Sequence, residues 1–412
     1  MPKTQKNKKT STKSGAKGKL FWKKTKEILR TAYHSVMALL TIILCGIVIL
    51  SAYSDIVNPQ WWVYPSFIGI GFGVLLVLLL IWTITLLILT RWRCLMVVGI
   101  TVLLVSPTIW RYCPLHLFGG PSPITSIKGP DGRNRTIDVD SLRILSYNTC
   151  ALGQTHLTKL NEPIPIMDFV KDAGADIVCM QEYAFTLSKG GHTQEQLRGT
   201  LSKKYPYYDF TPNDSRTAMG IVLFSKYPIR KAVRVDKSKK DYFSCMYYQL
   251  DVNGRLIGLI NMHLHSNGIE VKDRVLYDEM IDHFEADSIG RIRSGLLHSL
   301  GIAFRKRASE STQIARFLRD NHLEDMPLII CGDMNDTPVS FCYHTISQGL
   351  TDTWSEAGIG YGITYNEHHF WFRIDHMLHS SQFRALDMQV RTDIPYSDHY
   401  PIMATFQLLP ER

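Results

Sequence analysis

The hydrophobic positions divide the chain into two parts with different patterns. Three apolar stretches, Ser35–Tyr53, Pro65–Thr90 and Cys94–Trp110, fill most of the N-terminal part. About 20 apolar helical residues cross the hydrocarbon core of a bilayer, so the first two stretches are long enough to span it. The third is shorter and contains Pro107, but no charged residue interrupts it. The pattern therefore predicts a membrane anchor of about three helices over residues 31–112.

The placement of Lys and Arg predicts the orientation of this anchor, because basic flanks stay in the cytoplasm. Residues 1–30 are Lys-rich and should form a disordered cytoplasmic tail, whereas the loop Ser54–Tyr64 has no Lys or Arg and should lie outside. Arg91 returns the chain to the inside. A third crossing then places everything after Arg111 on the outer side, as in a bacterial inner-membrane protein with an exported domain. If the third stretch is re-entrant, that domain is cytoplasmic instead.

Charge is distributed unevenly between the two parts. Before residue 131 there are 15 Lys and Arg but two Asp and Glu, out of 46 and 37 in the whole chain, so the remainder has 31 basic and 35 acidic residues. A basic domain would indicate binding to a polyanion, and this remainder gives no such bulk signal. The eight Cys residues occur singly, with neither a CxxC pair nor zinc-ligand spacing.

Beyond residue 140, short apolar runs alternate with polar or amphipathic stretches, and residues 113–140, rich in Gly, Pro and Ser, are expected to be a linker. Runs of this length with much Ile, Val and Tyr favour strands. The predicted strands are Leu142–Tyr147, Asp176–Gln181, Met219–Phe224, Tyr242–Val252, Leu256–Leu264, Leu328–Cys331, Ile374–His379 and Ile402–Leu408. Helices are expected at Ile164–Ala173 and Glu310–Asn321. Residues 141–412 are therefore predicted to form one layered α/β or α+β domain.

The segment Asn267–Arg307 does not fit this alternation. It contains several acidic residues and ends in a basic and apolar run in which Leu296, Leu297, Leu300 and Phe304 recur at helical spacing. One hypothesis is an interfacial helix that touches lipid headgroups. The alternative, which we favour, is an inserted helix that packs on its own domain.

Polar and acidic residues recur where the apolar strands end. They are Asn148, Gln181, Glu182, His263, His265, Asp333, Asn335, Asp375, His376, Asp398 and His399. Each alone is ordinary turn chemistry, but strand ends at one sheet edge can present side chains to a common cleft. Carboxylates, amides and imidazoles without a thiolate are the donor set of a magnesium-type site. Histidines with carboxylate partners also supply acid and base groups near neutral pH.

The order of these residues resembles the endonuclease/exonuclease/phosphatase superfamily, which includes AP endonucleases, pancreatic-type deoxyribonucleases, inositol-polyphosphate 5-phosphatases and bacterial sphingomyelinases. The matching words are SYN, DIVCMQE, MGIVLFSKYPI, NMHLHS, CGDMND, RIDHML and SDHYPI, which follow one another from Ser146 to Ile402. The resemblance implies a four-layered α/β/β/α sandwich with the site at one sheet edge. It also implies a hydrolase that acts on phosphoester bonds with Mg²⁺, or with Mn²⁺ as a substitute.

The resemblance also implies a role for each matched residue. Glu182 would be the principal metal ligand, and Asn148 and Asp398 would complete or support the metal site. The other roles are catalytic or substrate-binding and fall to His263, His265, Asp333, Asn335, Asp375 and His399. Among them, Asp333 would orient or deprotonate the attacking water, Asn335 would hold a phosphate oxygen, and Asp375 would orient His399 against the phosphate.

Two of the histidines are weighed by strand alternation. His265 shares a strand face with His263 and is the weaker candidate for substrate binding, while His376 should point away from the site. Some nuclease members also pair a second carboxylate with the acid histidine, and we find no counterpart near Arg216–Met219. The group that protonates the leaving oxygen is therefore left unassigned.

Every matched position carries a competent residue, which favours an enzyme over a catalytically inactive binding module. The substrate remains open between a nucleic acid, which a nuclease would cleave, and a lipid or phosphoinositide headgroup, which the membrane anchor would bring near. The helices of the anchor would contact membrane lipids in either case.

Overall fold

The computed structural model describes residues 9–116, 119–128, 134–136, 141–153, 163–187, 191–213, 217–235, 243–266, 286–365, 367 and 371–410. The chain folds as two compact units. The smaller unit contains the residues up to Ser51 and Gly71–Ser106, and the larger contains Ala52–Ile70 and everything from Pro107 onward. The segment between the first two apolar stretches thus belongs with the larger unit, although the sequence assigned it to the anchor.

The apolar stretches form helices that could cross a bilayer. They are α1 (Lys9–Ala52), α3 (Phe72–Ile88) and α4 (Trp92–Tyr112). Helices α1 and α4 are each long and apolar enough to cross, whereas α3 is so only together with the short helix before it, Tyr64–Ile70. In the smaller unit, Trp82 Nε1 of α3 donates to Thr41 Oγ1 of α1 at 3.0 Å. Two or three helices are therefore apolar enough to span a membrane, which indicates a membrane anchor.

The second apolar stretch differs from the single helix that we expected. It is divided into α2 (Tyr64–Ile70) and α3, which are bent by 59° where Gly71 separates them. Glycine is a poor helix former, and this junction carries Gly69, Gly71 and Gly73 in alternate positions. Val63 and Phe67 beside the bend pack against α9 (Ala286–Asp320) of the larger unit.

The basic tail also differs from expectation, because α1 already begins at Lys9 instead of following a disordered segment. Extending a helix costs far less than nucleating one, and Lys is a good helix former. Leu20, Phe21 and Trp22 are exposed on this part of α1. Residues 1–8 lie outside the described residues.

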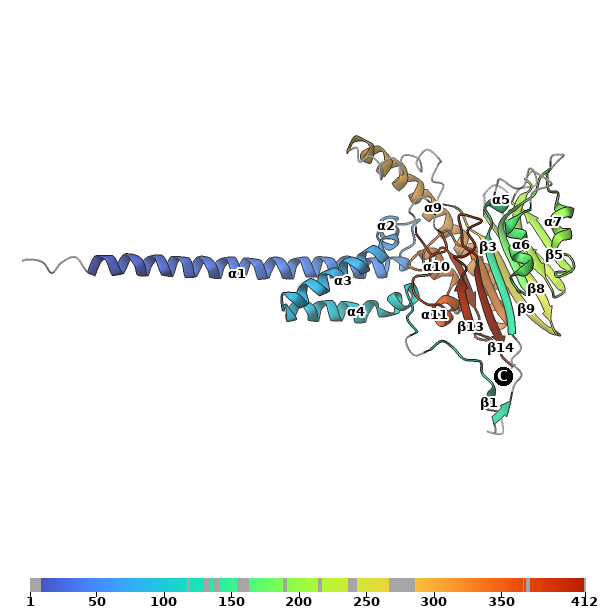
Figure 1. Ribbon diagram of the computed structural model, residues 1–412, viewed down its shortest axis with the longest axis horizontal. Helices are drawn as coiled ribbons and strands as arrows, with labels where there is room; N and C mark the ends of the chain where they lie inside the picture. Colours follow the sequence, from blue (N-terminus) through green and yellow to red (C-terminus); the bar gives the residue numbers. More distant parts are fainter. Residues whose placement is uncertain are drawn as a thin grey trace, which may run out of the picture. The chain divides into compact units, whose positions relative to one another are not determined.

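The larger unit is built on two six-stranded sheets, shown in Figure 1. The first has the order β13-β14-β3-β4-β6-β5, with bounds Phe383–Val390, Ile402–Leu408, Ser141–Asn148, Ile177–Ala184, Met219–Ser225 and Tyr207–Pro212. The second has the order β11-β12-β10-β9-β8-β7, with bounds Thr351–Asp352, Asp375–His379, Leu328–Asp333, Arg255–His263, Ser244–Val252 and Ile229–Arg234. Both are mixed, since β3 and β4 pair in parallel, as do β9 and β10. All eight predicted strands are present.

Three apolar cores show how the layers are stacked. Alternate side chains of both sheets, such as Ile144, Leu223 and Leu259, meet in a central core. The opposite face of the first sheet is covered by α6 (Pro165–Asp172) and α7 (Gln194–Leu201), and that of the second by α9 and α10 (Phe341–Ile346). Figure 1 shows α6 and α7 on the outer side of one sheet. This is the predicted four-layered α/β/β/α sandwich, and it is confirmed.

Buried amides join the two sheets directly. Gln181 Nε2 of β4 donates to Asn261 Oδ1 of β9 at 2.7 Å, and Asn261 Nδ2 lies 3.1 Å from the carbonyl oxygen of Val222 on β6. Buried polar groups need such partners, because an unpaired one costs about 1–3 kcal/mol. Gln181 is thus bonded between the sheets instead of facing the site.

The predicted linker and helices are only partly as expected. Within residues 113–140, β1 (Ser126–Lys128) pairs with β2 (Asn134–Thr136), and the Gln407 side chain bonds both backbone groups of Ile124. The helix predicted at Glu310–Asn321 is the end of the 35-residue helix α9. In the remaining segment, residues 267–285 lie outside the described residues. All eight Cys residues are free thiols.

A buried ion pair fixes the segment after α1 to the rest of the larger unit. Asp55 in η1 (Ser54–Ile56) accepts from Arg111 Nη2 at 2.7 Å and lies 3.5 Å from His344 Nδ1 of α10. Burial alone would raise the pKa of Asp55, but His344 and Arg111 together outweigh burial and lower that pKa below its ordinary value. The charged carboxylate therefore stabilises the docked segment.

Asp55→Asn should lower the unfolding free energy of the larger unit by about 1–3 kcal/mol at pH 7, because it leaves buried charges unpaired. Since the pKa of Asp55 is lower in the folded state, its contribution is fully present above its ordinary pKa of about 4 and is lost as the pH falls further, through the lower pKa of the folded state. Thermal unfolding of both proteins from pH 7 to pH 3 measures this. A difference that stays constant over the whole range would contradict the prediction.

Candidate active site

Three neighbouring strands of the second sheet bring acidic and imidazole groups together. Asp333 ends β10, and its register partners are His263 at the end of parallel β9 and Asp375 at the start of antiparallel β12. Gly332, with φ 138°, lies so close to β9 that a Cβ atom there would be 1.9 Å from the Met262 carbonyl oxygen. The close approach of these backbones sets the position of Asp333.

The first sheet contributes the ends of β3 and β4. Asn148 ends β3 and pairs with Gln181, and Glu182 follows in β4, where the register with β6 shifts between Met180 and Tyr183. Glu182 has φ 49°, a left-handed conformation that is uncommon for this residue type. A β-bulge re-aims a side chain, so this irregularity accounts for the direction of the Glu182 carboxylate.

The two sheets meet at the carboxylate of Asp333. Its Oδ2 accepts from Asn148 Nδ2 at 2.9 Å and from Asn335 Nδ2 at 3.0 Å, and its Oδ1 accepts from the Asn335 backbone N–H at 2.7 Å. His263 Nε2 lies 3.6 Å from Asp333 Oδ2 and 3.5 Å from Glu182 Oε1. Burial chiefly raises the pKa of Asp333, to about 6, and the nearby Asp375 charge adds to the rise.

His399, in the loop before β14, forms a buried pair with Asp375. Its Nδ1 lies 2.8 Å from Asp375 Oδ2, and its Nε2 lies 3.7 Å from Asp333 Oδ2. Although burial opposes the charged form, the carboxylates of Asp375 and Asp333 raise the pKa of His399 to about 10. The same pairing lowers the pKa of Asp375 despite its burial. The imidazole is therefore oriented, and its free nitrogen faces the cluster.

Asp398 is held beside this cluster through Ser397. The Ser397 hydroxyl lies 2.9 Å from the Asn148 carbonyl oxygen and 3.1 Å from Asp398 Oδ1. The loop that carries Asp398 and His399 is thereby fixed to the end of β3, where Asn148 is located.

The remaining histidines lie apart from the cluster. The His265 backbone N–H donates to Glu310 Oε2, and its ring Nε2 is 3.2 Å from Lys306 Nζ of α9. A substrate-binding role for His265 stays a prediction. His376 points to the other face of its strand, as alternation predicts, and its Nε2 is 2.9 Å from the Asp336 carbonyl oxygen. Burial and the charge of Arg373 lower the pKa of His376 to about 4.

Several residues that support the site were not identified from the sequence. Thr149 Oγ1 bonds the Glu182 carbonyl oxygen, and Thr364 Oγ1 accepts from the Asp375 backbone N–H. Arg307 of α9 is fully buried and bonds both Asp336 Oδ2 and the His265 carbonyl oxygen. These contacts join distant segments, and no local pattern marks them. Arg216 and residues 267–285 are outside the described residues.

The donor set fits a hard divalent cation. One oxygen or nitrogen atom from each of Asp333, Asp375 and His399 lies within 4.8 Å of the others. Glu182 Oε1 is not part of this group, but it lies 3.5 Å from His263 Nε2, which is itself 3.6 Å from Asp333 Oδ2. Among the described residues, neither ring nitrogen of buried His263 has a hydrogen-bond partner. Buried polar atoms are ordinarily bonded, and a catalytic or substrate-binding role for His263 stays a prediction.

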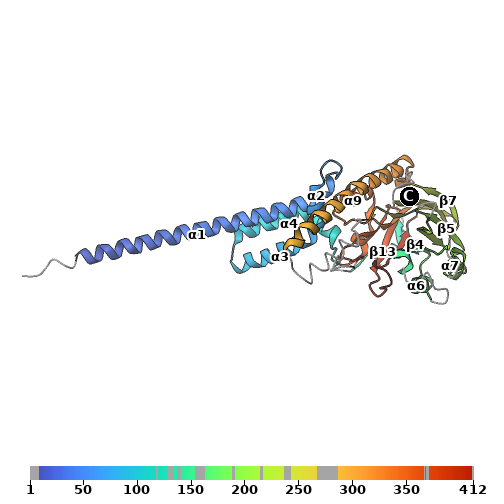
Figure 2. The same cartoon turned by 90° about the horizontal axis from the view of Figure 1, so that it is seen from above.

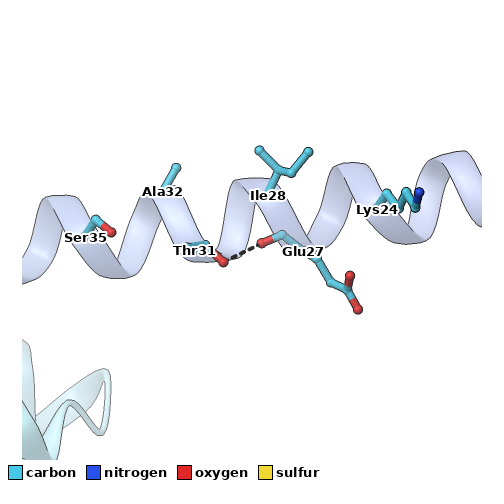
Figure 3. A pocket seen from close by; sticks show the side chains of 6 residues that line it. All are labelled: Lys24, Glu27, Ile28, Thr31, Ala32 and Ser35. Atoms are coloured by element: carbon cyan, nitrogen blue, oxygen red, sulfur yellow. Dashed lines mark hydrogen bonds between the residues drawn. The ribbon is translucent and has the colours of Figure 1, made fainter.

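A hollow elsewhere in the chain lacks the carboxylates and imidazoles of this cluster. It runs along α1 in the smaller unit and is shown in Figure 3. Its lining residues are Lys24, Glu27, Ile28, Thr31, Ala32 and Ser35. One helix supplies them all, and Thr31 Oγ1 is already bonded to the Glu27 carbonyl oxygen. This hollow is not a candidate active site.

The larger unit is thus a two-sheet sandwich with carboxylates and imidazoles gathered where the two sheets meet. The model of the Endonuclease/Exonuclease/phosphatase family matches residues 145–399, and the chain belongs to this family. Its members hydrolyse phosphoester bonds and generally use divalent metal ions, so the predicted family and enzyme class are confirmed. A second model, described as a domain of unknown function (DUF8431), matches residues 34–112. No curated protein matches this chain in sequence.

Solved structures are similar to this chain at low identity. An endonuclease/exonuclease/phosphatase from Beutenbergia cavernae DSM 12333 has 18% identity and a TM-score of 0.45, with 65% of this chain and 72% of that chain covered. The human Nocturnin catalytic domain has 16% identity and a TM-score of 0.44, with 65% and 93% covered. A mannosyl-6-phosphatase from Bacteroides thetaiotaomicron VPI-5482 has 16% identity and a TM-score of 0.41, with 64% and 99% covered.

Proposed function

We propose that this protein is a membrane-anchored, divalent-metal-dependent phosphoester hydrolase with Mg²⁺ as its resident ion. The observation that carries the proposal is the convergence of both sheets on Asp333, whose carboxylate contacts Asn148, Asn335, His263 and His399 within 3.7 Å. Neither sheet alone provides this set. A purely structural cluster would have no use for two imidazoles directed at one buried carboxylate.

In this proposal Glu182, Asn148 and Asp398 hold the cation, which when bound would neutralise charge on the phosphate oxygens. Asp333 lies where it can orient a water molecule and accept its proton. The water oxygen bonds to phosphorus, and the bond from phosphorus to the departing oxygen breaks. His263 and His399 donate to the other phosphate oxygens, where negative charge grows in the transition state. Asn335 joins them by exchanging the bond that its Nδ2 now donates to the Leu264 carbonyl oxygen at 3.1 Å. The departing oxygen takes a proton from solvent, so the products are an alcohol and a phosphate or phosphate monoester.

The helix ends that belong to the larger unit support the expected orientation of the membrane helices. The C-terminal ends of α1 and α4 both enter this unit, as does the chain before α3. If α1 and α4 each cross the bilayer toward this unit, then α3 must cross in the opposite direction. Its 17 residues extend about 26 Å, close to the hydrocarbon thickness. With the Lys-rich tail inside, three crossings place the catalytic domain on the extracytoplasmic side.

The test uses the full chain in detergent or nanodiscs, with bis(4-nitrophenyl) phosphate, DNA and RNA as substrates. We expect hydrolysis of at least one of these phosphodiesters that requires Mg²⁺, stops with EDTA and returns when Mg²⁺ is restored. Mn²⁺ should substitute. Hydrolysis that persists in EDTA would refute the metal-dependent mechanism, and a folded protein that cleaves none of them would support a binding module instead.

A further inference from the structure

The loop that follows β10 and carries Asn335 is bonded to the chain immediately after α1. Ser54 Oγ, two residues beyond the end of this helix, donates to the Val339 carbonyl oxygen at 3.2 Å. Val339 follows Asn335 by four residues, which span at most about 14 Å even when fully extended. Asn335, which holds a phosphate oxygen in the proposed function, therefore lies within about 14 Å of the Val339 contact with Ser54, in the segment between α1 and α2.

The last apolar helix is bonded to the site from the other side. Arg373 is 1% exposed, its Nη2 donates to the carbonyl oxygen of Arg111 near the end of α4, and Asp375 follows it by two residues. Trp110 Nε1 of the same helix donates to the Ser355 carbonyl oxygen, and the rings of Tyr112 and Tyr361 stack at 4.8 Å. The end of α4 is thus packed into the catalytic domain.

Helix α9 connects α2 with the residues beside the active site. Phe304 packs edge-on against Phe67 of α2 at 5.4 Å, and Leu300 belongs to the same apolar cluster. One turn beyond Phe304, Arg307 bonds Asp336 and the His265 carbonyl oxygen. The seven residues from Leu300 to Arg307 rise about 10 Å. Figures 1 and 2 both show α2 beside α9. The favoured hypothesis of an inserted helix agrees with these contacts.

The segment between α1 and α2 also has the side chains of a membrane interface. Trp61 is 86% exposed, Trp62 59% and Tyr64 66%, although large aromatic residues are ordinarily buried. Trp and Tyr collect at the headgroup level, where the ring is apolar and the polar atom is hydrated. These exposed aromatic residues, next to helices apolar enough to span a membrane, are what a segment at the bilayer surface would carry.

We infer that this enzyme acts on phosphoesters carried by the same membrane, with a lipid headgroup as the substrate. The inference rests on the proposed phosphoesterase function. Three independent sets of contacts hold the site close to the segment at the bilayer surface, whereas a site for soluble polymers would gain from a longer, flexible tether. The sequence beyond residue 130 is slightly acidic, with 31 basic and 35 acidic residues, which disfavours long polyanions such as nucleic acids.

The test compares one reacting group in two settings. The full chain is reconstituted in phosphatidylcholine vesicles with hexadecyl 4-nitrophenyl phosphate in the same bilayer, or with ethyl 4-nitrophenyl phosphate in solution. At equal total concentration with Mg²⁺, we expect release of nitrophenolate from the lipid ester at least about tenfold faster. Equal rates, or faster hydrolysis of the ethyl ester or of an oligonucleotide, would overturn the inference. Hydrolysis of none of them would instead count against the proposed function.

Variants separate docking from simple anchoring. Asp55→Asn weakens the contact with Arg111, and we expect it to reduce the preference for the lipid ester while the rate on the ethyl ester is unchanged. Asp251→Asn is the matched control, because Asp251 pairs with Arg230 at 2.6 Å on strands β7 and β8. If Asp55→Asn does not fold, Phe67→Ala removes the contact with α9 instead. An unchanged preference in a folded docking variant would refute the role of the docked segment.

Discussion

Replacing Glu182 with Gln should lower kcat/KM for phosphoester hydrolysis by roughly 10³-fold while the fold stays intact. The two side chains have nearly the same shape, and the Gln oxygen can still accept from Asn148 Nδ2, which lies 3.3 Å from Glu182 Oε1. The substitution removes the negative charge that the proposed cation requires. The Mg²⁺ concentration for half-maximal activity should therefore also rise, by about tenfold or more.

Glu356→Gln is the matched control. Glu356 also faces an imidazole, with Oε2 2.8 Å from His379 Nε2, and it accepts from the Ala385 backbone N–H. It lies on α11 (Thr353–Ala357), which follows β11 in the chain, and has no contact with the Asp333 cluster among the described contacts. This variant should lose some stability and keep kcat/KM within about twofold. If Glu182→Gln behaves like Glu356→Gln, Glu182 does not hold the metal.

Gly332→Ala should have the largest effect on stability, more than about 4 kcal/mol, because it forces a side chain into a neighbouring strand. The new Cβ would lie 1.9 Å from the Met262 carbonyl oxygen and 2.9 Å from two other backbone atoms of Met262. Backbone atoms cannot rotate away as a side chain can, so β9 and β10 must separate. Because Asp333 and His263 are the next register pair, activity should be lost as well.

Gly254→Ala separates the cost of the overlap with a neighbouring strand from the cost of the positive φ. Gly254 also has a positive φ, 90°, but no atom lies within 4 Å of its added Cβ. It should cost only about 1–2 kcal/mol, the cost of a left-handed backbone for a residue with a Cβ atom. Urea unfolding of both variants in detergent gives the comparison. Equal losses of unfolding free energy would show that the strands adjust to the extra atom without cost.

The sequence was sufficient for those parts of the fold that depend on local pattern. Each strand alternates or is uniformly apolar over its own length, so its position could be predicted without knowing its neighbours. Asn148, Asp333 and Asp375 were placed at strand ends for the same reason, and the structure brings them together where the two sheets meet. Their proposed roles stay predictions that the variants above can test.

Other features depend on partners distant in the chain, which no local pattern reveals. The bend at Gly71 leaves α2 to pack on α9, more than 200 residues away in sequence. Arg307 resembles any basic residue of a surface helix until Asp336 and the His265 carbonyl are seen beside it. The left-handed backbone of Glu182 follows from the bulge against β6, which depends on the pairing of two strands.

The amides of Gln181 and Asn261 have a consequence for the accuracy of catalysis. A slip of one sheet against the other by a single residue, about 3.3 Å, would break the bonds that these buried amides make between the sheets. Such a slip would cost several kcal/mol at about 1–3 kcal/mol for each unpaired group. It would also carry Asn148 out of reach of Asp333, which it now contacts at 2.9 Å. Two uncharged side chains that touch no substrate thus set the alignment on which turnover depends.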